Sequence, residues 1–170
     1  MSQENAIVVQ RSELLARVFL TRRLNINVHA FGDKSDEGID FICTIRHDRV
    51  KGFLPFGVQV WGTAKGLATE TDATTFGRQK KKAIKQATFF IPVVVLLFSM
   101  HNDEGYFSWI VEPCKEGNKL FHVPELKFKV FDTKQLDMMV KRIAAWYHRL
   151  SDDIVGDAGE IDSSQCPDDE

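Results

Sequence analysis

Asp40 and Gln59 are residues whose types and spacing could bind a metal ion. Asp40 stands near the start of an apolar run over residues 39–45, and Gln59 lies within the next such run, residues 53–61. Side chains about twenty residues apart on consecutive strands can converge when the two strands pair. Because carboxylate and amide oxygens are ligands of hard cations, the two residues form a candidate metal site.

Glu13 is a third candidate, on the flank of a helix that precedes both strands. It could reach a site at the edge of the sheet, or it could simply face water. The other two also have plain structural explanations. Asp40 could be a solvated carboxylate at a turn, and Gln59 could satisfy a buried backbone group.

A basic segment that follows these strands is a candidate nucleic-acid interface. It could contact a DNA backbone through charge-assisted, salt-sensitive bonds, or it could be a solvated helix face. Its basic residues are Arg78, Lys80, Lys81, Lys82 and Lys85.

The pattern of apolar residues predicts the elements that position these side chains. Helices are expected over residues 11–24, from 75 or 76 to 89, and from 132 or 133 to about 150. Strands are expected over residues 25–30, 39–45, 53–61 (broken early by Pro55), 91–98, 106–111 and 127–131. This order predicts an α/β fold in which a mixed central sheet is flanked by helices.

Length and composition predict one soluble domain over residues 11–150, between a polar segment, 1–10, and an acidic tail, 151–170. The tail contains eight of the 24 acidic residues and none of the 22 basic ones. It is expected to be disordered, and it could aid solubility or shield the mildly basic domain from nucleic acid.

The N-terminus does not read as a signal peptide, and the apolar run over residues 89–100 is too short to span a bilayer. We therefore expect a cytoplasmic protein with no membrane association. The three cysteines show no CxxC spacing, which predicts neither a disulfide framework nor a structural zinc site.

The order of elements from about Arg11 to Glu112 resembles the αβββαβ core of the PD-(D/E)XK phosphodiesterase superfamily, which has the restriction-endonuclease-like fold. Within it, the sequence is most similar to a bacterial family of unknown function with a helix Glu, a D-x-G-I-D segment and a strand reading Q-[VI]-K. An apolar Pro-Val strand and an aromatic hairpin follow in that family. The matching positions are Glu13, 36–40, 59–61, 92–96 and 106–109.

This resemblance implies a Mg²⁺- or Mn²⁺-dependent nuclease in which Glu13, Asp40 and Gln59 hold the metal. A lysine two positions after Gln59 would stabilise the attacking hydroxide and the charge that builds on phosphorus. Here that position is Trp61, which has no cation and transfers no proton. Two accounts remain: Lys65 or Lys51 supplies the cation from nearby, or the chemistry is lost and Trp61 fills the pocket.

The resemblance thus predicts a nuclease-fold protein that acts on or binds DNA in anti-phage defence or mobile-element biology, either as a metal-dependent phosphodiesterase or as a degenerate relative. The alternative is a catalytically inactive subunit that binds nucleic acid or a protein partner. A homodimer is plausible by analogy with the fold.

Overall fold

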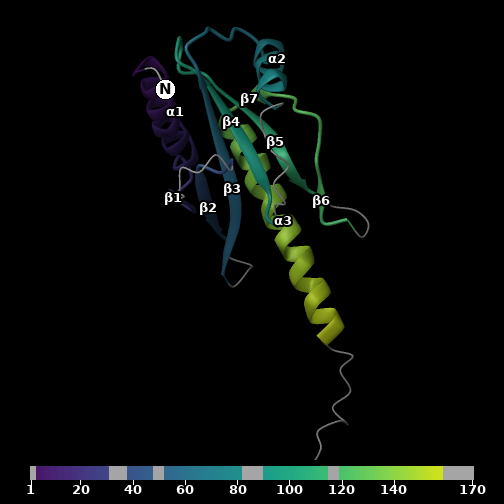
Figure 1. The fold of residues 1–170 in the computed structure, drawn as a ribbon. Coiled ribbons are helices and arrows are strands. Elements are labelled where there is room, and N and C mark those ends of the chain that lie inside the picture. The colour runs from purple at the N-terminus through teal and green to yellow at the C-terminus, as the bar shows by residue number, and fades with distance from the viewer. Residues whose placement is uncertain (1–2, 31–37, 48–51, 82–89, 115–118, 159–170) are drawn as a thin grey trace, which may run out of the picture.

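A computed structural model describes residues 3–30, 38–47, 52–81, 90–114 and 119–158. Figure 1 shows its helices and strands, which follow one another as α1 (Gln3–Leu20), β1 (Ile26–Ala30), β2 (Phe41–Arg46), β3 (Phe53–Thr63), α2 (Glu70–Lys81), β4 (Val93–Ser99), β5 (Gly105–Pro113), β6 (Phe121–His122), β7 (Lys129–Val130) and α3 (Thr133–Ala158).

The strands form one mixed, mostly antiparallel sheet in the order β1-β2-β3-β4-β5-β6, with β7 also paired to β5. The strands β1, β2 and β3 form an antiparallel meander. The chain then crosses over through α2, so that β4 lies parallel to β3, and β5 turns back antiparallel to β4. The predicted α/β fold with a mixed sheet is confirmed.

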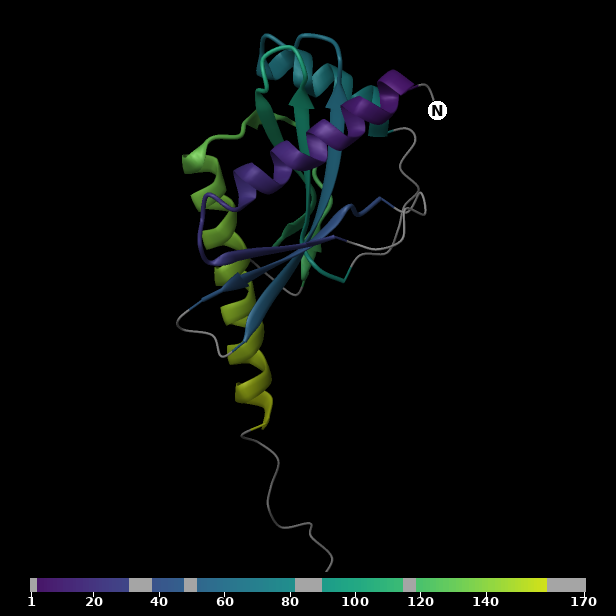
Figure 2. The same ribbon diagram turned by 90° about the vertical axis from the view of Figure 1, so that its left-hand side faces the viewer.

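Apolar clusters cover both faces of this sheet. On one face, residues of α1 such as Leu20 and residues of α3 such as Met139 pack on the strands. On the other face, Ala73 of α2 packs with Leu126 and Phe128 of the segment that follows β6. Figure 2 shows α1 crossing the strands obliquely while α3 runs past the end of the sheet. The central strand β4 is buried along its whole length, as its continuous apolar run predicts.

The helix α1 begins at Gln3, eight residues before the predicted start, so residues 3–10 are not a separate polar segment. Its first turns pack against β3 at Gly62. A Cβ atom at Gly62 would lie 2.8 Å from a methyl carbon of Val8 and 3.0 Å from the Ser12 hydroxyl. The absence of a side chain at Gly62 lets this part of α1 approach β3 closely.

The other two helices also differ from prediction. The helix α2 begins at Glu70 because Thr69 and Asp72 cap it: the Thr69 N–H donates to Asp72 Oδ2 and the Asp72 N–H donates to Thr69 Oγ1. The helix α3 begins as expected, with Asp132 Oδ1 accepting the Gln135 N–H. It continues to Ala158, through eight residues whose composition predicted disorder, and residues 159–170 lie outside the described part.

The strand β3 is not broken at Pro55. Pro55 pairs with Thr44 of β2, whereas β4 joins β3 only from Gly57 onward. Proline therefore lies where β3 has a neighbour on one side, and its missing N–H removes no bond between strands. The short strand β6, over residues 121–122, had no signal in the sequence pattern.

Candidate functional site

Asp40 lies immediately before β2, beside the middle of β3. The Asp40 N–H donates to the Val58 carbonyl at 2.9 Å, and the Val60 N–H donates to Asp40 Oδ2 at 2.6 Å. Because β2 pairs with β3 only up to Val58, the carboxylate takes the place that a longer β2 would fill. The half-buried Asp40 side chain is thus fixed against β3 by the fold itself.

Gln59 lies on β3 between Val58 and Val60, the two residues that bond Asp40. The segment that leads into β2 passes close to the side-chain amide of Gln59. Strand alternation places it on the same face as Trp61, which belongs to the apolar cluster beside α2. Gly38, at φ +91°, passes close by, since a Cβ there would lie 3.5 Å from Gln59 Nε2. Gln59 Oε1 is buried and has no hydrogen-bond partner within the described residues.

Glu13 lies on the side of α1 that faces the start of β2. Arg17, one turn further along α1, has its guanidinium carbon 4.8 Å from the centre of the Phe41 ring at the start of β2. Residues four apart share one side of a helix, so the half-buried Glu13 lies on that same side. Because α1 covers the face of the sheet opposite to the one that Gln59 shares with Trp61, the structure does not bring Glu13 and Gln59 together.

Asp40 and Gln59 offer oxygen ligands, which are the type that a hard cation prefers. Asp40 contributes a carboxylate, and Gln59 contributes an amide oxygen that the described residues leave without a partner. Across the described parts of the chain, however, no group of three or more His, Cys, Asp or Glu side chains comes together to hold a metal ion. A metal bound here would rest on few protein ligands, as Mg²⁺ commonly does.

Trp61 fills the position at which the resemblance implies a lysine. Its side chain is 4% exposed and belongs to the apolar cluster with Leu97 and Phe128. The ring centres of Trp61 and Phe128 lie 6.1 Å apart. The space beside Gln59 is therefore occupied by an indole ring and its apolar neighbours.

Lys65 lies beyond the end of β3, with its side chain exposed. Its N–H donates to Thr63 Oγ1 at 3.1 Å, and the Ser99 hydroxyl donates to its carbonyl at 3.4 Å. From Gln59 to Thr63 the strand alone rises by about 13 Å, at roughly 3.3 Å per residue. The structure thus places Lys65 away from Gln59, and Lys51 is outside the described residues.

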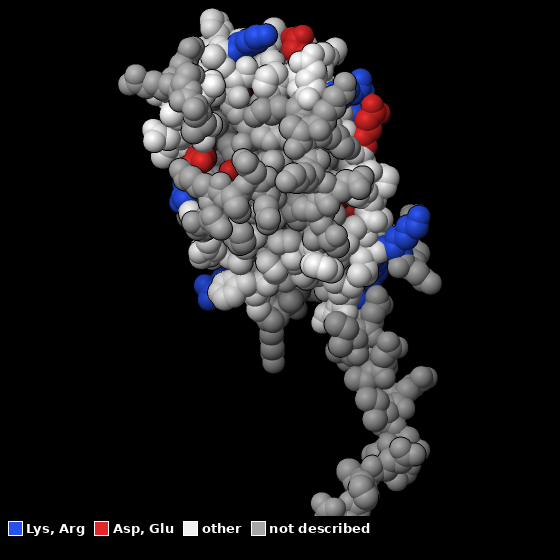
Figure 3. All heavy atoms as spheres, viewed as in Figure 1, with Lys and Arg blue, Asp and Glu red and all other residues white. Residues whose placement is uncertain are grey.

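Few of the basic candidates can be placed. Arg78 is exposed on α2 and forms an ion pair with Glu125 at 2.6 Å. Lys80 and Lys81 lie at the end of α2, and Lys82 and Lys85 lie outside the described residues. On the face in Figure 3, the Lys and Arg side chains in view lie around the rim.

Cys43 is a buried cysteine that takes no part in this site. Burial raises the pKa of its thiol to about 12, against a smaller lowering effect of Arg17. The thiol on β2 therefore stays protonated at neutral pH and is inert as a nucleophile or metal ligand.

A second concave region lies between β5, α3 and residues 124–129, and sequence reasoning missed it. Its cavity of about 260 Å³ is lined in part by Trp109, Lys127 and Lys129. The alternation of lysines with Leu126 and Phe128 was the available signal.

Comparisons with protein-family models, with curated proteins and with solved structures found no match for this chain. Within its described residues, no helix is long and apolar enough to cross a membrane.

Proposed function

We propose that this chain is a DNA-binding protein with a restriction-endonuclease-like core that has kept a metal-binding position and lost phosphodiester cleavage. The connectivity of the sheet supports the first part of the proposal. Helix α1, the meander β1–β3, the crossover helix α2 and a strand β4 parallel to β3 follow in the order αβββαβ. The position of Asp40 beside Gln59, at the point where β2 meets β3, supports the second part.

The observation that carries the loss of cleavage is the burial of Trp61. An indole has one N–H donor and no charge, so it can neither stabilise a hydroxide nor offset the charge on a phosphorane-like transition state. Its exposure of 4% and its contact with Phe128 make it a packing residue. With Lys65 held beyond the end of β3, we propose that no lysine replaces the missing cation.

Asp40 and Gln59 would hold a Mg²⁺ or Mn²⁺ ion through their oxygens. Such an ion supplies positive charge to a DNA phosphate. The chain's own contribution is to fix the Asp40 carboxylate through the Val60 N–H and to enclose the Gln59 amide under Gly38. This arrangement supports DNA binding that depends on a divalent cation.

The test combines metal binding with DNA cleavage. Tb³⁺ is a luminescent substitute for Mg²⁺, and Trp61 lies close enough to Gln59 in the strand to sensitise it. We expect the wild-type protein to give sensitised emission that Mg²⁺ displaces, and to leave plasmid DNA uncut with Mg²⁺ or Mn²⁺. In Asp40→Asn the emission should fall about tenfold or more, because the charged ligand is lost.

Asp40→Asn is preferred to Asp40→Ala because an asparagine oxygen can still accept the Val60 N–H. Asp152→Asn, which removes an exposed carboxylate on α3, is the matched control and should change nothing. Trp61→Lys, checked by circular dichroism for folding, should gain cleavage if the rest of the site is intact. Plasmid cleavage by the wild type that disappears in Asp40→Asn would contradict the proposed loss of catalysis.

A second candidate function, a non-catalytic subunit that docks a protein, is favoured by the outer side of α1. Ile7, Leu14 and Val18 are 59%, 63% and 58% exposed, and their spacing places them on one side of the helix. Salt separates the two functions. DNA binding should weaken steeply as salt rises, whereas an apolar protein interface should respond little.

A further inference from the structure

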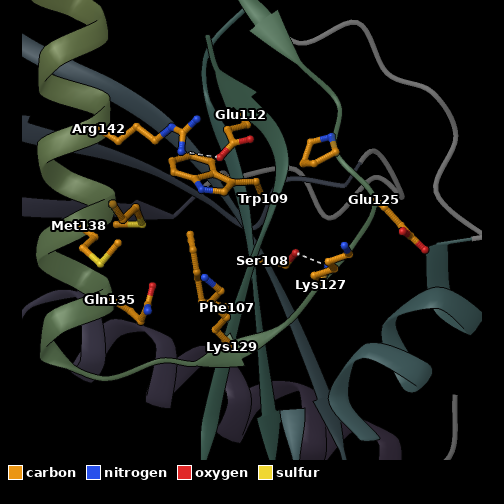
Figure 4. A pocket seen from close by; sticks show the side chains of 12 residues that line it. Phe107, Ser108, Trp109, Glu112, Glu125, Lys127, Lys129, Gln135, Met138 and Arg142 are labelled. Carbon is orange, nitrogen blue, oxygen red and sulfur yellow. Dashed lines mark hydrogen bonds and ion pairs between the residues drawn. The ribbon is translucent and has the colours of Figure 1, made fainter. Parts of the chain in front are cut away.

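The groove between β5, α3 and residues 124–129 results from the way the edge of β5 is covered (Figure 4). The strand β7 pairs with residues 106–107 at one end of β5, and β6 pairs with residues 112–113 at the other. Between these two strands, the segment is held to β5 by the Lys127 N–H, which donates to Ser108 Oγ at 3.1 Å. The cavity of about 260 Å³ is therefore bounded at both ends.

One side of the groove offers an aromatic and thioether surface. Trp109 of β5 is half-buried, and Phe107 supports it edge-on with ring centres 5.5 Å apart. From α3, Met138 faces the same space with 52% of its surface exposed. Tryptophan and methionine side chains pack well against a flat, polarisable ring. This surface suits a planar ring system.

The carboxylates of the groove are already paired. Glu112 of β5 forms an ion pair with Arg142 of α3 at 2.8 Å, and Glu125 pairs with Arg78 of α2 at 2.6 Å. Figure 4 shows the Glu112–Arg142 pair beside the Trp109 ring. These pairs leave little net negative charge in the groove.

The cations of the groove are not all paired. Lys127 and Lys129 are exposed, and neither forms an ion pair with a described residue. They alternate with Leu126 and Phe128, whose burial in the core fixes both lysines on the outer side. Two ammonium groups that line one cavity suit a dianion such as a phosphate monoester better than a single carboxylate.

We propose that this groove binds a free nucleoside monophosphate, with its base between Trp109 and Met138 and its phosphate at Lys127 and Lys129. The cavity of about 260 Å³ lies between β7 and the Glu112–Arg142 pair, and it is the size of one nucleotide. The inference goes beyond the proposed DNA function and uses neither Asp40 nor Gln59.

Calorimetric titration with adenosine 5′-monophosphate and guanosine 5′-monophosphate tests the proposal. We expect one of them to bind one molecule per chain, while adenosine, guanosine and inorganic phosphate bind at least about tenfold more weakly. The double variant Lys127→Gln, Lys129→Gln should lose about tenfold in affinity. The matched control, Lys134→Gln with Lys141→Gln, removes two exposed charges from α3 outside the groove and should bind normally.

The aromatic wall is tested separately. Trp109→Ala should weaken binding about fivefold to a hundredfold, the range known for a base stacked on an aromatic side chain. Because Trp109 also packs on Phe107, Met138→Glu at the exposed methionine gives a second variant that spares the core, and it should weaken binding by charge repulsion.

Three results would overturn the proposal: no binding of either nucleotide at millimolar concentration, unchanged affinity in the double lysine variant, or binding of single-stranded DNA in the groove without binding of the mononucleotides. None of these results bears on metal binding at Asp40. The two proposals can therefore fail independently.

Discussion

At the scale of single residues, the Asp40 carboxylate has a structural role, because it binds the backbone of β3. The carboxylate accepts the Val60 N–H where β2 has not yet begun to pair. Removing the whole side chain would leave that N–H without its partner, at a cost of about 1–3 kcal/mol. Loss of function in an alanine variant would therefore be ambiguous, whereas the asparagine variant removes the charge and keeps the bond.

The buried thiol of Cys43 predicts a dependence of stability on pH. Its pKa is raised to about 12 in the folded state, whereas an unfolded thiol loses its proton near pH 9. Its contribution to stability is fully present below pH 9 and is lost as the pH rises toward 12, by about 1.4 kcal/mol per pH unit. In urea unfolding at pH 9–11, Cys43→Ala should therefore lose stability less steeply than the wild type.

Two tyrosines, Tyr106 and Tyr147, also have pKa values raised mainly by burial, but they are present in both proteins and cancel in the comparison. Cys114→Ala, which removes the half-buried thiol, is the matched control. Equal slopes for wild type and Cys43→Ala would mean that the Cys43 thiol is solvated.

Single residues also show what the sequence could and could not predict about the site. The spacing of Asp40 and Gln59 predicted that paired strands would bring them side by side, which the strand register allows. The bond to Val60 could not be predicted, because it depends on the residue at which β2 begins to pair. The placement of Lys65 likewise depends on Ser99, which lies far away in the sequence.

At the scale of elements, Gly77 fixes how α2 packs on the second face of the sheet. A Cβ atom at Gly77 would lie 2.2 Å from Cε2 of Phe128, whose ring is buried against Trp61. Gly77→Ala should gain about 1 kcal/mol of helix propensity and lose about 1–3 kcal/mol through overpacking. We expect a net loss of stability in urea unfolding.

The control for this prediction is Thr71→Ala, at an exposed position of the same helix, which should stabilise the protein by a few tenths of a kcal/mol. A more stable Gly77→Ala protein would show that Phe128 moves aside at no cost.

The elements that could be predicted are those with a strong local pattern. The apolar run of β4 indicates a strand buried on both faces, and Asp132 correctly marks the start of α3. The start of α2 was also encoded, by Thr69 and Asp72, although the helix was predicted to begin only at residue 75 or 76. The start of α1 was not encoded by a local pattern. Its residues Val8 and Ser12 contact Gly62, which belongs to another element.

At the scale of the whole molecule, the sheet combines local and distant pairings. The meander joins strands that follow one another, whereas the parallel pair joins Val60 to Leu96 across the α2 crossover. Because closing a longer loop costs more entropy, the meander should form first. In pulsed hydrogen exchange during refolding, amides of Phe41–Arg46 should gain protection before those of Val93–Ser99, and the reverse order would contradict this prediction.

The complete burial of β4 has a consequence for handling the protein. Until its neighbours on both sides are in place, its seven residues present an uncharged and largely apolar surface to water. Such a stretch is prone to pair with its copy in another chain. The yield of refolding should therefore fall as protein concentration rises, and a solubilising mutation is better placed on flanking residues than within the strand itself.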